Sequence, residues 1–189
     1  RMPFDEATLF LDGYSNEDKM KFLCVFGEYP YYLSKIDHER TFEENVRDLL
    51  FNENSVLLDV PKLVLSNSFR EQSFYNSILL ALAGKKKDLT EIGLSMNESV
   101  IKINKYIRTL TDAEMVTKKT MYNSTRQTYY CISDPVLRFY YQFLMRNIEK
   151  IEAGYGDLVY ERLKEKINLF ISTSFEDVSI SYMEYLGRK

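Results

Sequence analysis

The stretch from residue 74 to residue 132 constrains the fold more than any other part of the chain. It begins with apolar residues at spacings that share one helical face: Phe74, Ile78, Ala81 and Leu82. Gly84 is expected to end this helix, and Lys85, Lys86 and Lys87 follow as a basic turn. Residues 89–94 then have the length of a second short helix.

A third helix and a hairpin complete this stretch. Asn97 or Ser99 is expected to cap the helix, whose apolar stripe has the spacing i, i+3, i+7, i+10: Val100, Ile103, Ile107 and Leu110. Two β-like runs, 115–118 and 128–132, flank a polar segment from Lys119 to Gln127 that predicts a hairpin. Three helices followed by a hairpin predict a winged helix-turn-helix.

Helix signals also dominate the rest of the chain. Ser15 predicts a helix N-cap, Thr41 with Glu44 a capping box, and Asp134-Pro135 another helix start. The predicted fold is therefore mainly α with one small β-hairpin. Three segments are expected: a helical domain at 1–67, the winged helix at 68–133, and a C-terminal helical segment at 134–189. In the last, an apolar helix that Gly154 and Gly156 break is followed by separate helices over 158–170 and 175–186.

Composition limits the classes of protein that remain. With 189 residues, 45% of them hydrophobic, the chain can bury one large core or two small ones. The sequence has no apolar run long enough for a membrane span and no signal peptide is recognised. Cys24 and Cys131 are far apart and His38 is the single histidine, so we expect buried thiols in a reducing, cytoplasmic compartment and no metal site.

The net charge of −3 hides a basic block. Between Ser68 and Ser133 there are ten Lys and Arg against six Asp and Glu, which indicates an anionic partner. On the third helix, the face opposite the apolar stripe carries residue types that contact phosphates and base edges: Lys102, Asn104, Lys105, Arg108 and Thr109. The predicted wing adds three cations that reach the flanking DNA backbone: Lys118, Lys119 and Arg126.

Two alternatives to double-stranded DNA stay open for this face. Ile101 lies within the same polar arc, and an exposed isoleucine suits a protein contact as well as a thymine methyl. The face can also be simply solvated. Catalysis by this chain alone is not expected, because it lacks GxxxxGK[ST], GxGxxG, GxSxG and HExxH, and its seven glycines are scattered singly.

Several segments together resemble prokaryotic, archaeal-type ATPases of the AAA+/STAND class. Residues 27–33, Gly-Glu-Tyr-Pro-Tyr-Tyr-Leu, look like the Gly-Gly-x-Pro-x-Tyr-Leu segment of that family's helical lid, and 42–46 are similar to its next helix. Residues 74–84 resemble the opening of its winged helix, and 130–140 its Y-x-I-x-D-x-x-L-R-F-W/Y pattern. Residues 172–176, Ser-Thr-Ser-Phe-Glu, are like the start of its restriction-endonuclease-like module.

The resemblance implies a non-catalytic C-terminal region of such an ATPase, and a first residue other than methionine agrees with a piece of a longer protein. ATP and Mg would then bind the parent protein, with Gly27 and Pro30 lying next to the nucleotide. Glu28 stands where the family has a second glycine, and no nuclease metal core follows Glu176. The alternatives are a free-standing winged-helix transcription regulator that binds DNA and a protein-interaction module that self-associates or binds a partner.

Overall fold

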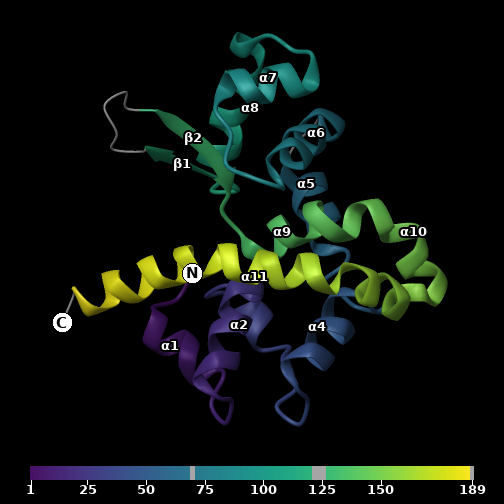
Figure 1. Ribbon diagram of the computed structural model, residues 1–189. Coiled ribbons are helices and arrows are strands. Elements are labelled where there is room, and N and C mark those ends of the chain that lie inside the picture. The colour runs from purple at the N-terminus through teal and green to yellow at the C-terminus, as the bar shows by residue number, and fades with distance from the viewer. Residues whose placement is uncertain (69–70, 121–126, 188–189) are drawn as a thin grey trace. The chain divides into compact units, whose positions relative to one another are not determined.

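The computed structural model describes residues 1–68, 71–120 and 127–187. The chain is mainly α-helical with one small antiparallel sheet, which confirms the predicted fold class (Figure 1). Backbone contacts divide it into two units, one formed by Arg1–Leu58 with Arg146–Lys189 and the other by Asp59–Met145.

The first unit packs its N-terminal helices along a long C-terminal helix. Its elements are α1 (Phe4–Leu9), α2 (Asn16–Phe26), α3 (Pro30–Leu33), α4 (Phe42–Leu50), α10 (Ile148–Lys150), a π-helical turn (Ile151–Tyr155) and α11 (Gly156–Leu186). Helix α11 contacts α1, α2 and α4 (Figure 1). Phe22, Phe26 and Leu50 are fully buried in the core of this unit.

Two helix starts in this unit follow the predicted capping chemistry. The Ser15 hydroxyl accepts a hydrogen bond from the Asp18 amide at 3.1 Å. At the start of α4, the Thr41 hydroxyl accepts from the Glu44 amide at 3.3 Å, and the Thr41 amide donates to the Glu44 carboxylate at 2.8 Å. These hydrogen bonds confirm both predictions. Each cap stabilises the start of its helix because it satisfies amides that the first turn leaves without partners.

The C-terminal helices differ from the prediction of two separate helices over 158–170 and 175–186. The structure has a single helix of 31 residues, α11. No glycine or proline interrupts it after Gly156, and the hydroxyls of Ser172 and Thr173 donate back to the carbonyls of Asn168 and Phe170, both at 3.0 Å. Because these hydroxyls bond within the helix, a Ser-Thr-Ser sequence does not end it. The segment 172–176 therefore lies inside α11.

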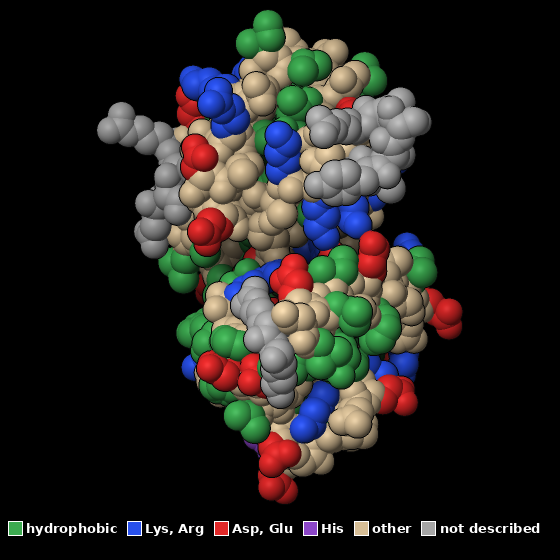
Figure 2. Space-filling view, turned by 90° about the vertical axis from the view of Figure 1, so that its left-hand side faces the viewer, with side chains coloured by type: hydrophobic (Ala, Val, Ile, Leu, Met, Phe, Trp, Pro, Cys, Tyr) green, Lys and Arg blue, Asp and Glu red, His purple; other side chains and the backbone are tan. Residues whose placement is uncertain are grey.

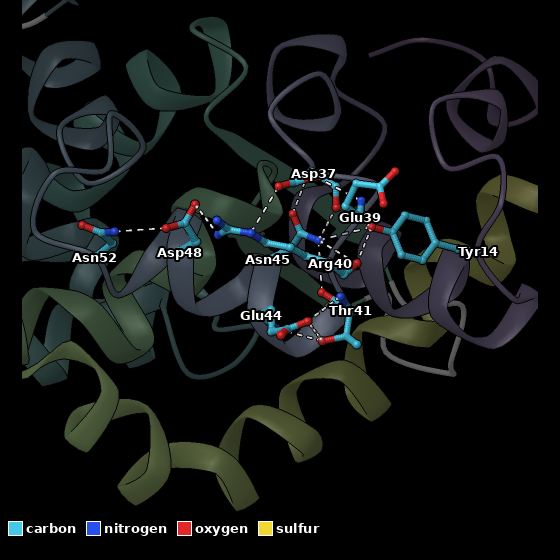
Figure 3. A network of polar contacts seen from close by, with 9 residues as sticks. All are labelled: Tyr14, Asp37, Glu39, Arg40, Thr41, Glu44, Asn45, Asp48 and Asn52. Atoms are coloured by element: carbon cyan, nitrogen blue, oxygen red, sulfur yellow. Dashed lines mark hydrogen bonds and ion pairs between the residues drawn. The ribbon is translucent and has the colours of Figure 1, made fainter.

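A buried amide holds the irregular segment between α3 and α4 (Figure 3). Asn45, 1% exposed, donates to the carbonyls of Asp37 at 2.9 Å and Thr41 at 3.0 Å, and accepts from the Asp37 amide at 2.8 Å. The Tyr14 hydroxyl donates to the carbonyls of Asp37 at 2.8 Å and Arg40 at 2.7 Å. These side chains add hydrogen bonds to the backbone of residues 37–41, which leads from α3 into α4.

The second unit has the predicted order of three helices and two strands. Its elements are α5 (Val60–Ser68), α6 (Gln72–Leu82), α7 (Leu89–Met96), α8 (Val100–Asp112), β1 (Val116–Thr120), β2 (Thr128–Ile132), α9 (Pro135–Phe139) and a π-helical turn (Tyr140–Leu144). The strands pair antiparallel, with Val116 opposite Ile132 and Thr120 opposite Thr128 (Figure 1). Residues 121–126 of the predicted hairpin lie outside the described residues.

The limits of the units differ from the predicted segments 1–67, 68–133 and 134–189. Helices α5 and α9 belong to the unit of the winged helix, since α5 contacts α6 and α9 contacts β2. Residues 146–189 join the N-terminal helices instead of forming a segment of their own, because α11 packs along α2. Pro135 begins α9 after an Asp134 cap, as predicted, but the apolar run that follows is a succession of short α, π and 3-10 turns.

Candidate nucleic-acid interface

A tight turn between α7 and α8 sets the position of α8. Asp88 and Glu91 form a capping box at the start of α7, and Asn97 ends this helix in the left-handed region, with φ of 53°. Gly93 lies against the next segment, because a Cβ at this position would be 2.8 Å from the Glu98 carbonyl oxygen. Ser99, one of the two predicted caps, accepts from the Lys102 amide at 3.3 Å and begins α8.

The inner face of α8 anchors it to the rest of its unit. Ile103, Ile107 and Leu110 are 0% exposed, as predicted, whereas the prediction for Val100 is wrong because this residue of the first turn is 42% exposed. Tyr106, which the apolar stripe missed, is buried instead, with its ring centroid 4.3 Å from that of Phe74.

The hydroxyl of Tyr106 adds a polar link to this packing. It donates a hydrogen bond to the carboxylate of Glu71, and this bond to a charged acceptor raises the pKa of Tyr106 to about 12. Glu71 immediately precedes α6, so the contact ties the middle of α8 to the start of α6. Helix α8 is thus held through both apolar and polar contacts.

The outer face of α8 carries two exposed cations, and the one carboxylate of this helix is Asp112, its last residue. Lys105 and Arg108 are exposed and Asn104 is half-buried beside them. No Asp or Glu occurs between Ser99 and Thr111, so the sequence places no acidic side chain on this part of the helix. Ile101, 86% exposed, shares the face by its spacing of three and four residues from Asn104 and Lys105.

Lys102, one of the cations predicted on α8, forms an ion pair with Glu98. Its Nζ lies 2.6 Å from a carboxylate oxygen of Glu98 and 4.3 Å from the centroid of the Phe74 ring. The neighbouring carboxylate weakens the attraction of Lys102 for an anion, so Lys105 and Arg108 are the stronger candidates on this helix.

The wing separates the two lysines predicted there. Lys118 is exposed and lies opposite Tyr130, whereas Lys119 is half-buried and lies opposite Tyr129. Successive side chains of a strand point to opposite faces of the sheet, so Lys118 and Lys119 do not share a surface. The third predicted cation, Arg126, lies outside the described residues.

The basic turn before α7 is a part of this region that the sequence analysis did not assign to the site. The Lys87 amide donates to the Tyr130 carbonyl at 3.1 Å, and the Tyr130 amide donates to the Lys87 carbonyl at 2.8 Å. Lys85 and Lys86 are exposed next to it. The three consecutive lysines are visible in the sequence as a basic turn. Their position beside β2 depends on the pairing of Lys87 with Tyr130, 43 positions later in the chain.

The view in Figure 2 shows Lys and Arg side chains in several separate groups and not as one continuous patch. On this face of the molecule, the positive charge is therefore divided among separate groups of side chains.

The residues that the family resemblance connects with nucleotide lie in the first unit. Gly27 ends α2 with φ of 66°, and its amide donates to the Leu23 carbonyl at 3.0 Å. Pro30 is exposed at the first position of α3. Glu28 between them is buried at 8% exposure and accepts a hydrogen bond from the Ser181 hydroxyl of α11. The segment is thus tied to α11.

Two open pockets of about 460 and 590 Å³ also lie in the first unit. Charged side chains of both signs line them, including Arg40, Arg47 and Asp48 in the first and Lys21, Glu43 and Lys164 in the second. Within residues 1–68, 71–120 and 127–187, no group of three His, Cys, Asp or Glu side chains is placed to hold a metal ion. In the same described ranges, no helix combines the length and apolar character that a bilayer crossing requires.

Comparisons with known proteins find a family match at the end of the chain. Residues 140–189 match a family of archaeal and bacterial proteins of unknown function, DUF234. The C-terminal part is similar to that family. An uncharacterized protein of Methanocaldococcus jannaschii is 24% identical over 162 residues, which make up 84% of this chain and 36% of the relative. The chain thus spans little more than a third of that relative's length. No solved structure matches the chain.

Proposed function

We propose that the unit Asp59–Met145 binds duplex DNA, with the outer face of α8 in the major groove. The observation that carries this proposal is the exposed pair Lys105 and Arg108 on the face opposite the buried Ile103 and Ile107, within a helix that has no carboxylate between Ser99 and Thr111. Cationic and amide side chains on one face of a recognition helix contact phosphates and base edges.

In this proposal the chain is a non-catalytic part of a longer, cytoplasmic AAA+/STAND-type ATPase. Its first unit acts as the helical lid, with Gly27 and Pro30 near a nucleotide, and ATP and Mg²⁺ bind residues of the parent protein outside this chain. The support is the resemblance of residues 27–33, 74–84 and 130–140 to that family, together with a relative of which the chain spans 36%. The winged helix then links the nucleotide state to DNA.

A salt titration of duplex binding tests the DNA contact. Each neutralised phosphate contributes a slope of about 0.9 to the fall of log K with log salt, so Lys105→Gln with Arg108→Gln should flatten the slope by about 1.8. Lys150→Gln with Lys166→Gln, which removes two exposed charges from the first unit, serves as a matched control and keeps the wild-type slope. No duplex binding by the wild-type chain at low salt contradicts the proposal.

A second candidate function is a protein contact at the junction of α7 and α8. Leu94 is 79% exposed and Ile101 86%, and Figure 2 shows hydrophobic side chains exposed at the upper end of this unit. Isolated exposed apolar residues are common, but two beside one helix–helix turn favour an apolar partner surface. This candidate predicts that Leu94→Ser with Ile101→Ser abolishes binding of a partner or self-association measured by sedimentation and leaves the salt slope of DNA binding unchanged.

A further inference from the structure

Lys87, Tyr130 and Lys118 form one row across the sheet of the winged helix. Lys87 pairs with Tyr130 through two backbone hydrogen bonds, and Tyr130 lies opposite Lys118 in the register of β1 and β2. Since the Tyr130 amide and carbonyl both bond to Lys87, Tyr130 and Lys118 form the non-hydrogen-bonded type of antiparallel pair, in which side chains approach most closely.

Residues directly opposite each other in a sheet project from the same face. Lys87 and Lys118 therefore flank the side chain of Tyr130 on one face, with Cα atoms about 10 Å apart by the usual spacings of the two pair types. The same face carries Val116 and Ile132, which are 1% and 2% exposed, so the core of the unit holds this row in place. Lys118 is exposed and Lys87 is half-buried beside Tyr130, which is 9% exposed.

We infer that Lys87 and Lys118, on either side of Tyr130, form a second site for the phosphate backbone of duplex DNA. This inference rests on the proposed function of α8 and adds the turn before α7 to the contact surface. Two ammonium groups on rigidly paired backbone segments suit neighbouring phosphates, which position a protein on DNA without reading its sequence. Lys119, on the opposite face of β1, has no part in this site.

The inference is tested on the full chain with Lys87→Gln, Lys118→Gln and their combination. Binding of a random-sequence duplex is measured between about 50 and 200 mM salt, where loss of one phosphate contact lowers the log–log slope by about 0.9. Over this fourfold range of salt, the ratio of wild-type affinity to the affinity of each single variant should fall about 3.5-fold. The same ratio for the double variant should fall about 12-fold. The Lys87 backbone bonds survive the substitution, and an unchanged thermal midpoint verifies the fold.

Lys119→Gln is the control, since it removes the same charge from the adjacent position of the same strand. A wild-type slope for Lys119→Gln, with reduced slopes for the other two, supports the inference. Equal losses from all three lysines overturn the assignment to one face. Unchanged slopes for Lys87→Gln and Lys118→Gln, while the α8 double variant loses slope, overturn the inference and leave the proposed function intact. Absence of duplex binding by the wild-type chain at low salt overturns both.

Discussion

Gly156 lies directly against the carbonyl oxygen of Phe51, so that a Cβ at position 156 would be only 1.6 Å from that oxygen. The contact joins the start of α11 to the residue that ends α4, 105 positions earlier in the chain. It explains why glycine, a poor helix former, stands at the first position of the longest helix.

Gly156→Ala is expected to destabilise the first unit by about 3 kcal/mol, because the new methyl group can be accommodated only by moving backbone. Helix propensity alone predicts the opposite sign. Gly84→Ala is the control, as nothing lies within 4 Å of a Cβ there, and it should change stability by about 0.5 kcal/mol or less. Urea unfolding followed by circular dichroism measures both, and equal midpoints for the two variants contradict the prediction.

Asn45→Ala should destabilise the same unit by about 3 kcal/mol, because it removes a buried amide that accepts from the Asp37 amide and donates to the carbonyls of Asp37 and Thr41 (Figure 3). Asn54→Ala removes an exposed amide and should change stability by about 0.5 kcal/mol or less. The comparison uses the free energy of unfolding in urea. If Asn45→Ala lowers the free energy of unfolding no more than Asn54→Ala does, the hydrogen bonds of Asn45 do not stabilise this segment.

The stability of the first unit should depend on the ionisation of Glu43. Arg47, at 2.7 Å, and Lys164, at 2.9 Å, hold the pKa of Glu43 below its ordinary value of 4.5. A carboxylate with a lowered folded pKa contributes fully above that ordinary value, and its contribution disappears as the pH falls through the folded pKa. Glu43→Gln should therefore be less stable at neutral pH by about 0.5–1 kcal/mol, a figure reduced for solvent screening.

The difference between wild type and Glu43→Gln should then close as the pH falls below 4.5. This stability difference is measured by thermal unfolding of both proteins at a series of pH values and constant ionic strength. A gap of the same size in strong acid and at neutral pH indicates that the loss in the variant has another origin than the ion pairs.

Two isoleucines of α8, two positions apart, should respond very differently to truncation. Ile103 is 0% exposed, so Ile103→Ala removes core packing and should cost about 3 kcal/mol of stability in the second unit. Ile101 is 86% exposed, and Ile101→Ala should change stability by about 0.5 kcal/mol or less. Thermal unfolding provides the measurement. A large loss for Ile101→Ala would mean that its side chain is buried in solution.

The sequence by itself determined most of the local structure. Ser15, Thr41 with Glu44, Ser99, and Asp134-Pro135 each begin the helix that they predict, because capping acts over three or four residues. The apolar stripe predicted the burial of Ile103, Ile107 and Leu110 correctly, because helical periodicity is also a short-range property. It failed at Val100 and missed Tyr106, which packs against Phe74 of α6 and bonds to Glu71 just before that helix.

Only the tertiary structure decided which distant segments meet. The contact of Gly156 with Phe51, the continuity of α11 along α2, and the pairing of Lys87 with Tyr130 each join residues that no local pattern relates. For the candidate site, the sequence predicts that Lys105 and Arg108 share a face of α8, because they are three residues apart. The placement of Lys118 and Lys119 on opposite faces of the sheet follows from the strand register. Local signals act within one or two turns, while close approach between remote segments is set by how the whole core packs.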